Sequence, residues 1–259
     1  MSKLQNNQEI LEIHSMLDEL PTVEQIQEPL LNELVTVQDV VRFLVTTFAK
    51  HSIFVGHGTC NYWDEALEIV QAVMHLQPPC DESTLNSRLT KKEREIIAKI
   101  AALRVIDRIP TPYLTHRAFF CGKEFYVDDR VIIPRSPIAE LIEAGFDPYV
   151  DRRPERVLDM CTGSACIAIA TALQFDGEVE VDAVDISDEA LEVANINMQG
   201  YGLENIVTPI KSDLFNDLPK GDKYDVIVAN PPYVGSYDLS TMPDEFRCEP
   251  DLALGSGDD

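Results

Sequence analysis

Residues 225–233, D-V-I-V-A-N-P-P-Y, constrain the fold of this chain more than any other stretch. Residues 226–228 are β-branched and apolar on both faces, which predicts a strand buried inside a parallel sheet. Two prolines follow, and each stiffens the residue before it. Asn230 is therefore held at a fixed angle at the carboxyl edge of the sheet, where open α/β folds bind ligands. Residues 230–233 alone are equally consistent with a turn that ends a strand.

Strands and helices alternate from residue 156 onward. Alternation of this kind predicts an α/β fold with a parallel, doubly wound sheet. Ser187 precedes two acids and is placed to cap a helix. The expected strands are 157–160, 179–184, 207–210 and 225–229, and the expected helices are 166–173 and the segment after Ser187.

The first 110 residues have a helical pattern. Thr36 is placed to cap a helix with its apolar face at 37–48, and residues 90–93, T-K-K-E, form a capping box. We expect a small helical bundle that recognises the substrate. The predicted domains are 1–110 (helical), 111–136 (a β-hairpin linker) and 137–259 (α/β), with Ser136 as the N-cap of the first helix in the last. The predicted apolar faces of the later two helices of the bundle are Trp63, Ala66, Leu67, Val70 and Met74, then Ile96, Ile97, Ile100 and Leu103.

Charge narrows the class of partner. The formal net charge is −24, and residues 111–259 hold 11 Lys and Arg against 29 Asp and Glu, a balance of −18. Affinity for nucleic acid depends on Lys and Arg that displace counterions from phosphates. We therefore expect a neutral or cationic partner and no binding of free DNA.

Cysteine, histidine and hydropathy point to a cytoplasmic protein without a metal. The six cysteines form no C-x-x-C pair and the histidines are scattered, so no metal site is expected. No segment approaches the ~18 apolar residues of a membrane helix, and residues 1–7 lack the layout of a secretory signal. The thiols are then expected to be reduced.

A small-residue loop and a distant acid suggest a nucleoside site. The loop 161–165 has one glycine, Gly163, so it is not a dinucleotide fingerprint, which requires three. Asp185 ends the next predicted strand, 22 residues after Gly163. That is close to the spacing of about 20 residues at which a carboxylate binds ribose hydroxyls.

Four motifs, in this order, resemble the S-adenosylmethionine-dependent protein glutamine methyltransferases. They are 159–165 (D-M-C-T-G-S-A), Asp185, 212–215 (S-D-L-F) and 230–233 (N-P-P-Y). The resemblance covers nearly the whole chain. It implies a Rossmann-like class I methyltransferase domain that binds S-adenosylmethionine and methylates the side-chain amide of a glutamine in a translation protein.

Further motifs distinguish two branches of that family. The release-factor branch usually has I-P-R-P-x-T-E where residues 133–138 read I-P-R-S-P-I. Together with 56–59 (G-H-G-T), 63–66 (W-D-E-A) and 120–122 (F-C-G), the I-P-R-S-P version resembles the branch that acts on the third large-subunit ribosomal protein. That ribosomal protein is the implied partner, and release factors are the alternative.

The resemblance also implies roles for individual residues. The Asn230 side-chain oxygen and the Pro231 carbonyl accept hydrogen bonds from the target amide, and Tyr233 forms an aromatic wall beside it. Asp213 accepts from the adenine amino group, Leu214 covers the ring, and Asp159 lies near the sulfonium. The implied substrate site is Asn230, Pro231, Pro232 and Tyr233, and the implied cofactor site is Asp159, Cys161, Thr162, Gly163, Ser164, Ala165, Asp185, Asp213 and Leu214.

Three expectations remain open. The family has glycine where Ala165 stands, and a positive φ there would cost Ala about 1 kcal/mol. Residues 249–259 stop inside a loop pattern, so we expect a truncated domain whose last strands are missing. The competing functions are a nucleic-acid amino methyltransferase, which has a similar N-P-P-Y motif, and a truncated chain that only binds a ribosomal protein.

Overall fold

The computed structural model describes residues 20–221 and 223–255, and the chain divides into two compact units between Thr111 and Pro112. Within the described residues, no helix is both long enough and apolar enough to cross a membrane. The first unit is helical, with α2 (Val23–Asn32), α3 (Val37–Lys50), α4 (Tyr62–Val73), α5 (Glu82–Leu85) and α6 (Lys91–Ile106).

The capping predictions for the first unit are confirmed. Thr36 and Thr90 each accept from the backbone N–H three residues later and close a capping box. The predicted apolar face of α6 is only partly right, since Ile97 and Ile100 are buried but Ile96 and Leu103 are 40% and 41% exposed. Arg104 takes part of the buried face instead.

A buried ion pair explains why Arg104 is buried and what holds the G-H-G-T loop at 56–59. The Arg104 Nε donates to Glu65 Oε1 over 2.7 Å, and both side chains are almost fully buried. Thr59 and Thr111 donate to the same carboxylate at 2.5 and 2.7 Å. Glu65 on α4 therefore holds the loop at 56–59, whereas Trp63, predicted to be on the core face, is 40% exposed.

The second unit begins with α7 (Thr111–Thr115), which spans the division, and a hairpin of β1 (Ala118–Phe120) and β2 (Lys123–Phe125). Cys121 and Gly122 in its turn both have positive φ, as tight hairpin turns require. The helix α8 (Ile138–Glu143) follows. Its N-cap residue is Pro137 rather than Ser136, whose Oγ accepts from the Ile138 N–H at 3.3 Å.

The remaining elements build a four-stranded parallel sheet, as predicted. Its spatial order is β5-β4-β3-β6, and all neighbours are parallel. The elements are β3 (Arg156–Met160), α9 (Cys166–Gln174), β4 (Glu180–Asp185), α10 (Asp188–Tyr201), β5 (Val207–Lys211), β6 (Val226–Ala229), α11 (Ser236–Thr241), the 3-10 helix Asp244–Cys248 and α12 (Asp251–Leu254).

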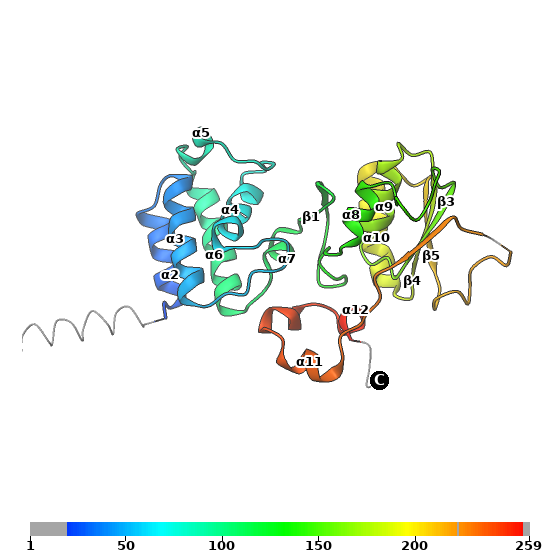
Figure 1. The fold of residues 1–259 in the computed structure, drawn as a ribbon. Helices are drawn as coiled ribbons and strands as arrows, with labels where there is room; N and C mark the ends of the chain where they lie inside the picture. The colour runs from blue at the N-terminus through cyan, green and yellow to red at the C-terminus, as the bar shows by residue number, and fades with distance from the viewer. Residues whose placement is uncertain (1–19, 222, 256–259) are drawn as a thin grey trace, which may run out of the picture. The chain divides into compact units, whose positions relative to one another are not determined.

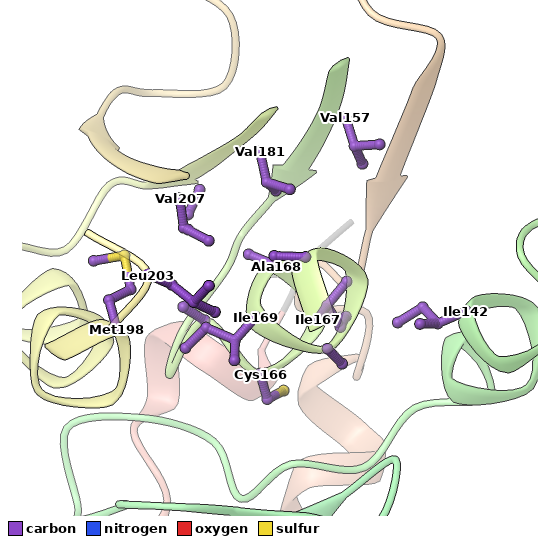
Figure 2. Close-up of a cluster of buried hydrophobic side chains, with 14 of the residues drawn as sticks. Ile142, Val157, Cys166, Ile167, Ala168, Ile169, Val181, Met198, Leu203 and Val207 are labelled. Carbon is purple, nitrogen blue, oxygen red and sulfur yellow. The ribbon is translucent and has the colours of Figure 1, made fainter. Parts of the chain in front are cut away.

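The main core lies between one face of the sheet and α8, α9 and α10. Figure 2 shows Val157, Val181 and Val207 pointing from three strands toward α9. Strand side chains alternate between faces, so Leu158, Met160 and Val184 form a smaller cluster on the opposite face.

The prediction that β6 is buried on both faces is wrong. Val228 faces the main core and is buried, but Ile227 points to the opposite face and is 53% exposed. Ile227 is exposed because β6 lies at the edge of the described sheet and pairs only with β3.

Candidate functional site

A cavity of about 620 Å³ lies at the carboxyl ends of the parallel strands. Met160, Asp185, Ser212 and Asn230, which end or follow the four strands, all line it. A second hollow of about 680 Å³ lies at the opposite edge of the sheet, near Arg156 and Asp225. Open parallel sheets bind ligands at their carboxyl edge, so the first cavity is the candidate site.

The loop after β3 approaches this cavity through two residues, Cys161 and Gly163. Both have left-handed φ values, of 60° and 56°. Thr162, Ser164 and Ala165 belong to the same loop and to the predicted cofactor set, but their side chains are buried and do not border the cavity. Their contribution is therefore to the shape of the loop.

Burial also determines the chemistry of Cys161. It raises the pKa of this thiol to about 11, with smaller contributions from Asp185 and Asp159. A thiolate, not a thiol, is the reactive nucleophile of cysteine. Cys161 thus lines the cavity as a neutral, unreactive side chain.

Asp159 lies inside the fold rather than in the cavity. Its side chain is fully buried, and Oδ2 accepts from Thr162 Oγ1 at 2.5 Å and from the Ala168 N–H at 3.1 Å. Burial raises the pKa of this carboxyl to about 7. The structure does not support direct contact between Asp159 and a cofactor, and shows instead that it ties the loop to α9.

Asp185, by contrast, borders the cavity. Its Oδ2 accepts from the Gly163 N–H at 2.9 Å and its Oδ1 accepts from the Ser187 N–H at 3.0 Å. Each carboxylate oxygen has a further lone pair. The side chain is therefore oriented by the backbone and retains acceptor capacity for hydroxyl groups in the cavity.

Asp213 and Leu214 border the cavity where β5 ends. Ser212 shapes this turn, because its Oγ donates to the Leu214 carbonyl at 2.8 Å and accepts from the Asp217 N–H at 3.0 Å. Leu214 has a φ of 51° and is more than half exposed. An exposed apolar side chain beside a carboxylate suits the flat face and the amino edge of a base.

The tetrapeptide after β6 forms another side of the cavity. Asn230, Pro231 and Pro232 line it, whereas Tyr233 is 74% exposed and does not. The expected aromatic wall is thus not formed in this structure. Val234, directly afterwards, donates from its N–H to the Leu254 carbonyl at 2.9 Å.

Comparison with known proteins identifies the family. Residues 147–243 match the family described as Methyltransferase small domain. The chain is 44% identical over 238 residues to the ribosomal protein uL3 glutamine methyltransferase of Francisella tularensis subsp. tularensis, covering 91% of this chain and 75% of the relative. It is 46% identical over 230 residues to the protein of the same name from Bordetella pertussis, covering 88% and 76%.

The chain belongs to the uL3 glutamine methyltransferase family. Among solved structures, a SAM-dependent methyltransferase from Agrobacterium tumefaciens is 24% identical, with a TM-score of 0.36 over 45% of this chain and 39% of that one. A similarity of that size supports no inference about the fold. The parallel sheet itself agrees with the predicted Rossmann-like class.

Two segments of this methyltransferase line the cavity but were not predicted to do so. They are residues 129–132, before the I-P-R-S-P motif, and residues 250–255, where Pro250, Leu252, Ala253 and Gly255 take part. Local residue patterns did not predict that these segments border one cavity. The contact between Arg135 and Glu249, which follow and precede them, joins residues 114 positions apart. Within residues 20–221 and 223–255 no cluster of His, Cys, Asp and Glu could hold a metal ion.

Proposed function

We propose that this protein transfers a methyl group from S-adenosylmethionine to the side-chain amide nitrogen of a glutamine in ribosomal protein uL3. One observation carries the proposal. Asn230 and Pro231 border the same cavity as Asp185 and Asp213. The amide that accepts the methyl group can therefore lie next to the nucleoside of the cofactor. The names of the two relatives support the choice of uL3 as substrate.

The residues present fit S-adenosylmethionine. Asp185 is oriented toward the cavity with acceptor capacity for both ribose hydroxyls. Asp213 and Leu214 fit the amino edge and the face of adenine. Gly163, without a side chain, lets the loop approach the methionine part, whose carboxylate suits the N-terminal end of α9. The cofactor supplies a methyl group on a positively charged sulfur, and the protein supplies position and electrostatics.

An amide nitrogen is a poor nucleophile because its lone pair is delocalised into the carbonyl. In the proposed mechanism the Asn230 side-chain oxygen and the Pro231 carbonyl each accept one N–H, which holds the nitrogen in line with the methyl group. The same acceptors stabilise positive charge as it develops on nitrogen. The methylated nitrogen is acidic, so water removes the proton and no protein base is required.

Two further assignments rest on the proposed substrate. The helical unit before Thr111 contains the G-H-G-T and W-D-E-A motifs, and we assign substrate recognition to it. The buried Glu65–Arg104 pair and the bond from Thr59 to Glu65 hold the two motifs together. Modification of a ribosomal protein also assigns the enzyme to the cytoplasm.

The deciding test offers purified uL3, a peptide chain release factor and duplex DNA to the enzyme with labelled S-adenosylmethionine. We expect label only in uL3, with a mass increase of one methyl on a single glutamine-containing peptide. Label in the release factor would move the enzyme to the other branch of the family. Label in DNA, or in none of the three, would contradict the proposal.

A further inference from the structure

Three segments that are distant in sequence border the same cavity. They are residues 129–132, residues 230–232 and residues 250–255. Because β6 is an edge strand, Asn230 is supported by the sheet on one side only, through the pairing of Ala229 with Met160. Something else must hold the tetrapeptide on its other side.

An ion pair joins two residues that lie next to these segments, Arg135 after residues 129–132 and Glu249 before residues 250–255. The Glu249 side chain is completely buried and its oxygens accept from Arg135 Nη1 at 2.7 Å and Arg135 Nη2 at 2.5 Å. The Ile133 N–H donates to the same carboxylate at 3.1 Å, and the guanidinium lies 5.2 Å from the Phe246 ring centroid. A two-point contact between planar groups fixes orientation as well as distance.

The ion pair is connected to the tetrapeptide through α12. Glu249 precedes this helix, and Leu254 ends it. The Leu254 carbonyl accepts from the Val234 N–H at 2.9 Å, and Val234 pairs with Gly255 in a parallel bridge. A movement of Glu249 would therefore be transmitted through α12 to Val234 and the tetrapeptide before it.

We propose that Arg135 and Glu249 are positioning residues that hold Asn230 against the reacting amide. The proposal rests on the proposed function and extends it to two residues that do not border the cavity themselves. The cofactor-binding residues Gly163, Asp185 and Asp213 lie on the other three strand ends. The connection through α12 leads to Val234 and the tetrapeptide, so the pair should act mainly on turnover.

The test is Arg135→Lys in the full chain, which keeps the charge but removes the two-point contact. A misplacement of about 1 Å can cost about 10²-fold in rate, so we expect kcat to fall by roughly 10- to 100-fold. The Kd for S-adenosylmethionine and the KM for uL3 should stay within about twofold. Glu249→Gln, which keeps the acceptor oxygen but loses the charge, should shift kcat in the same direction.

Arg156→Lys is a matched control. Arg156 also pairs with a buried acid, Asp182, at 2.7 Å and lies 5.1 Å from the ring centroid of Tyr224, but at the opposite edge of the sheet. Loss of these Arg156 contacts should lower the stability of the protein without lowering kcat. A second measurement is independent of substrate. Amide hydrogen exchange at Val234 should accelerate in Arg135→Lys and stay unchanged in Arg156→Lys.

The outcomes are distinguishable. Parental kcat in Arg135→Lys, equal losses in both arginine variants, or a parallel loss of cofactor affinity would each overturn the positioning role. If the parent enzyme methylates no uL3, the proposed function fails. The exchange comparison would still decide whether the ion pair holds the tetrapeptide, because unchanged exchange at Val234 would contradict it.

Discussion

The Gly163 N–H donates a 2.9 Å hydrogen bond to Asp185 Oδ2, which joins the loop after β3 to the acid that ends β4. Asp185 thus has two tasks, since it orients the loop that faces the cavity and presents a carboxylate to it. The loop and the acid lie 22 residues apart, and the parallel pairing of β3 with β4 brings them together.

Asp185→Ala should weaken cofactor binding. Charge-assisted hydrogen bonds contribute about 1.5–3 kcal/mol each, so the Kd for S-adenosylmethionine should rise by at least about tenfold in calorimetry. Because the acid does not contact the amide, saturating cofactor should restore most of the turnover. Asp188→Ala, an exposed acid outside the cavity, is the control and should leave Kd unchanged. Equal Kd values for Asp185→Ala and the parent would remove Asp185 from the cofactor site.

Asn230→Ala should act mainly on turnover. The proposed contact strengthens as charge develops on nitrogen, so its loss lowers kcat. By analogy with removal of one oxyanion-hole donor, the decrease should be about 10²–10³-fold. Cofactor affinity and fold should be retained, because the adjacent prolines set the backbone. Asn205→Ala, at the other edge of the sheet, should leave kcat at the parental value. Near-parental turnover in a folded Asn230→Ala would reduce the tetrapeptide to a structural turn.

Ala165→Gly should be less destabilising than Ala168→Gly. Ala165 is buried with a φ of 60°, which confirms the positive φ that the sequence left open. Ala168 is equally buried but lies inside α9. Both variants lose one buried methyl group, but only Ala165→Gly relieves left-handed strain of about 1–2 kcal/mol, and only Ala168→Gly incurs a helix penalty of about 1 kcal/mol. Urea unfolding should therefore separate the two by about 2 kcal/mol or more. Equal losses would mean that Ala165 is unstrained.

The raised pKa of Asp159 predicts that the stability of the folded protein depends on pH. Burial raises its pKa in the folded state from 3.8 to about 7, so between these values the folded state binds a proton that the unfolded state has released. The contribution of Asp159 to stability is therefore lost as pH rises from about 4 to about 7. Asp159→Asn cannot ionise, so its unfolding midpoint relative to the parent should rise over this range. A constant difference between Asp159→Asn and the parent would exclude a shifted pKa.

The acidic charge predicts electrostatic assistance to substrate capture. Residues 111–259 carry a balance of −18, and an opposite field steers a cationic protein toward the site. At sub-saturating uL3, rates should fall as salt rises to physiological strength, because screening then acts over about 8 Å. kcat at saturating uL3 should be nearly independent of salt over the same range. Salt-independent capture would show that the charge serves another purpose.

The sequence by itself determined the local structure and the order of the site motifs. Thr36, Thr90 and Ser187 begin helices where capping predicts, because a cap depends on residues within one turn. The alternation of strand and helix was sufficient for the parallel sheet, since a parallel crossover requires an intervening helix. The positions of Asp185, Asp213 and Asn230 after successive strands then placed all three at one edge.

Only the tertiary structure decided which of the acids near the strand ends face the cavity. The β3–β4 register sets Asp159 level with Ala183, inside the sheet and under α9, whereas Asp185 lies two residues further along β4 and reaches the cavity. Ile227 is exposed because β6 is at an edge, which a run of apolar residues does not reveal. The contact of Arg135 with Glu249 spans 114 residues. Such contacts depend on how the whole chain packs, and local residue patterns carry no record of them.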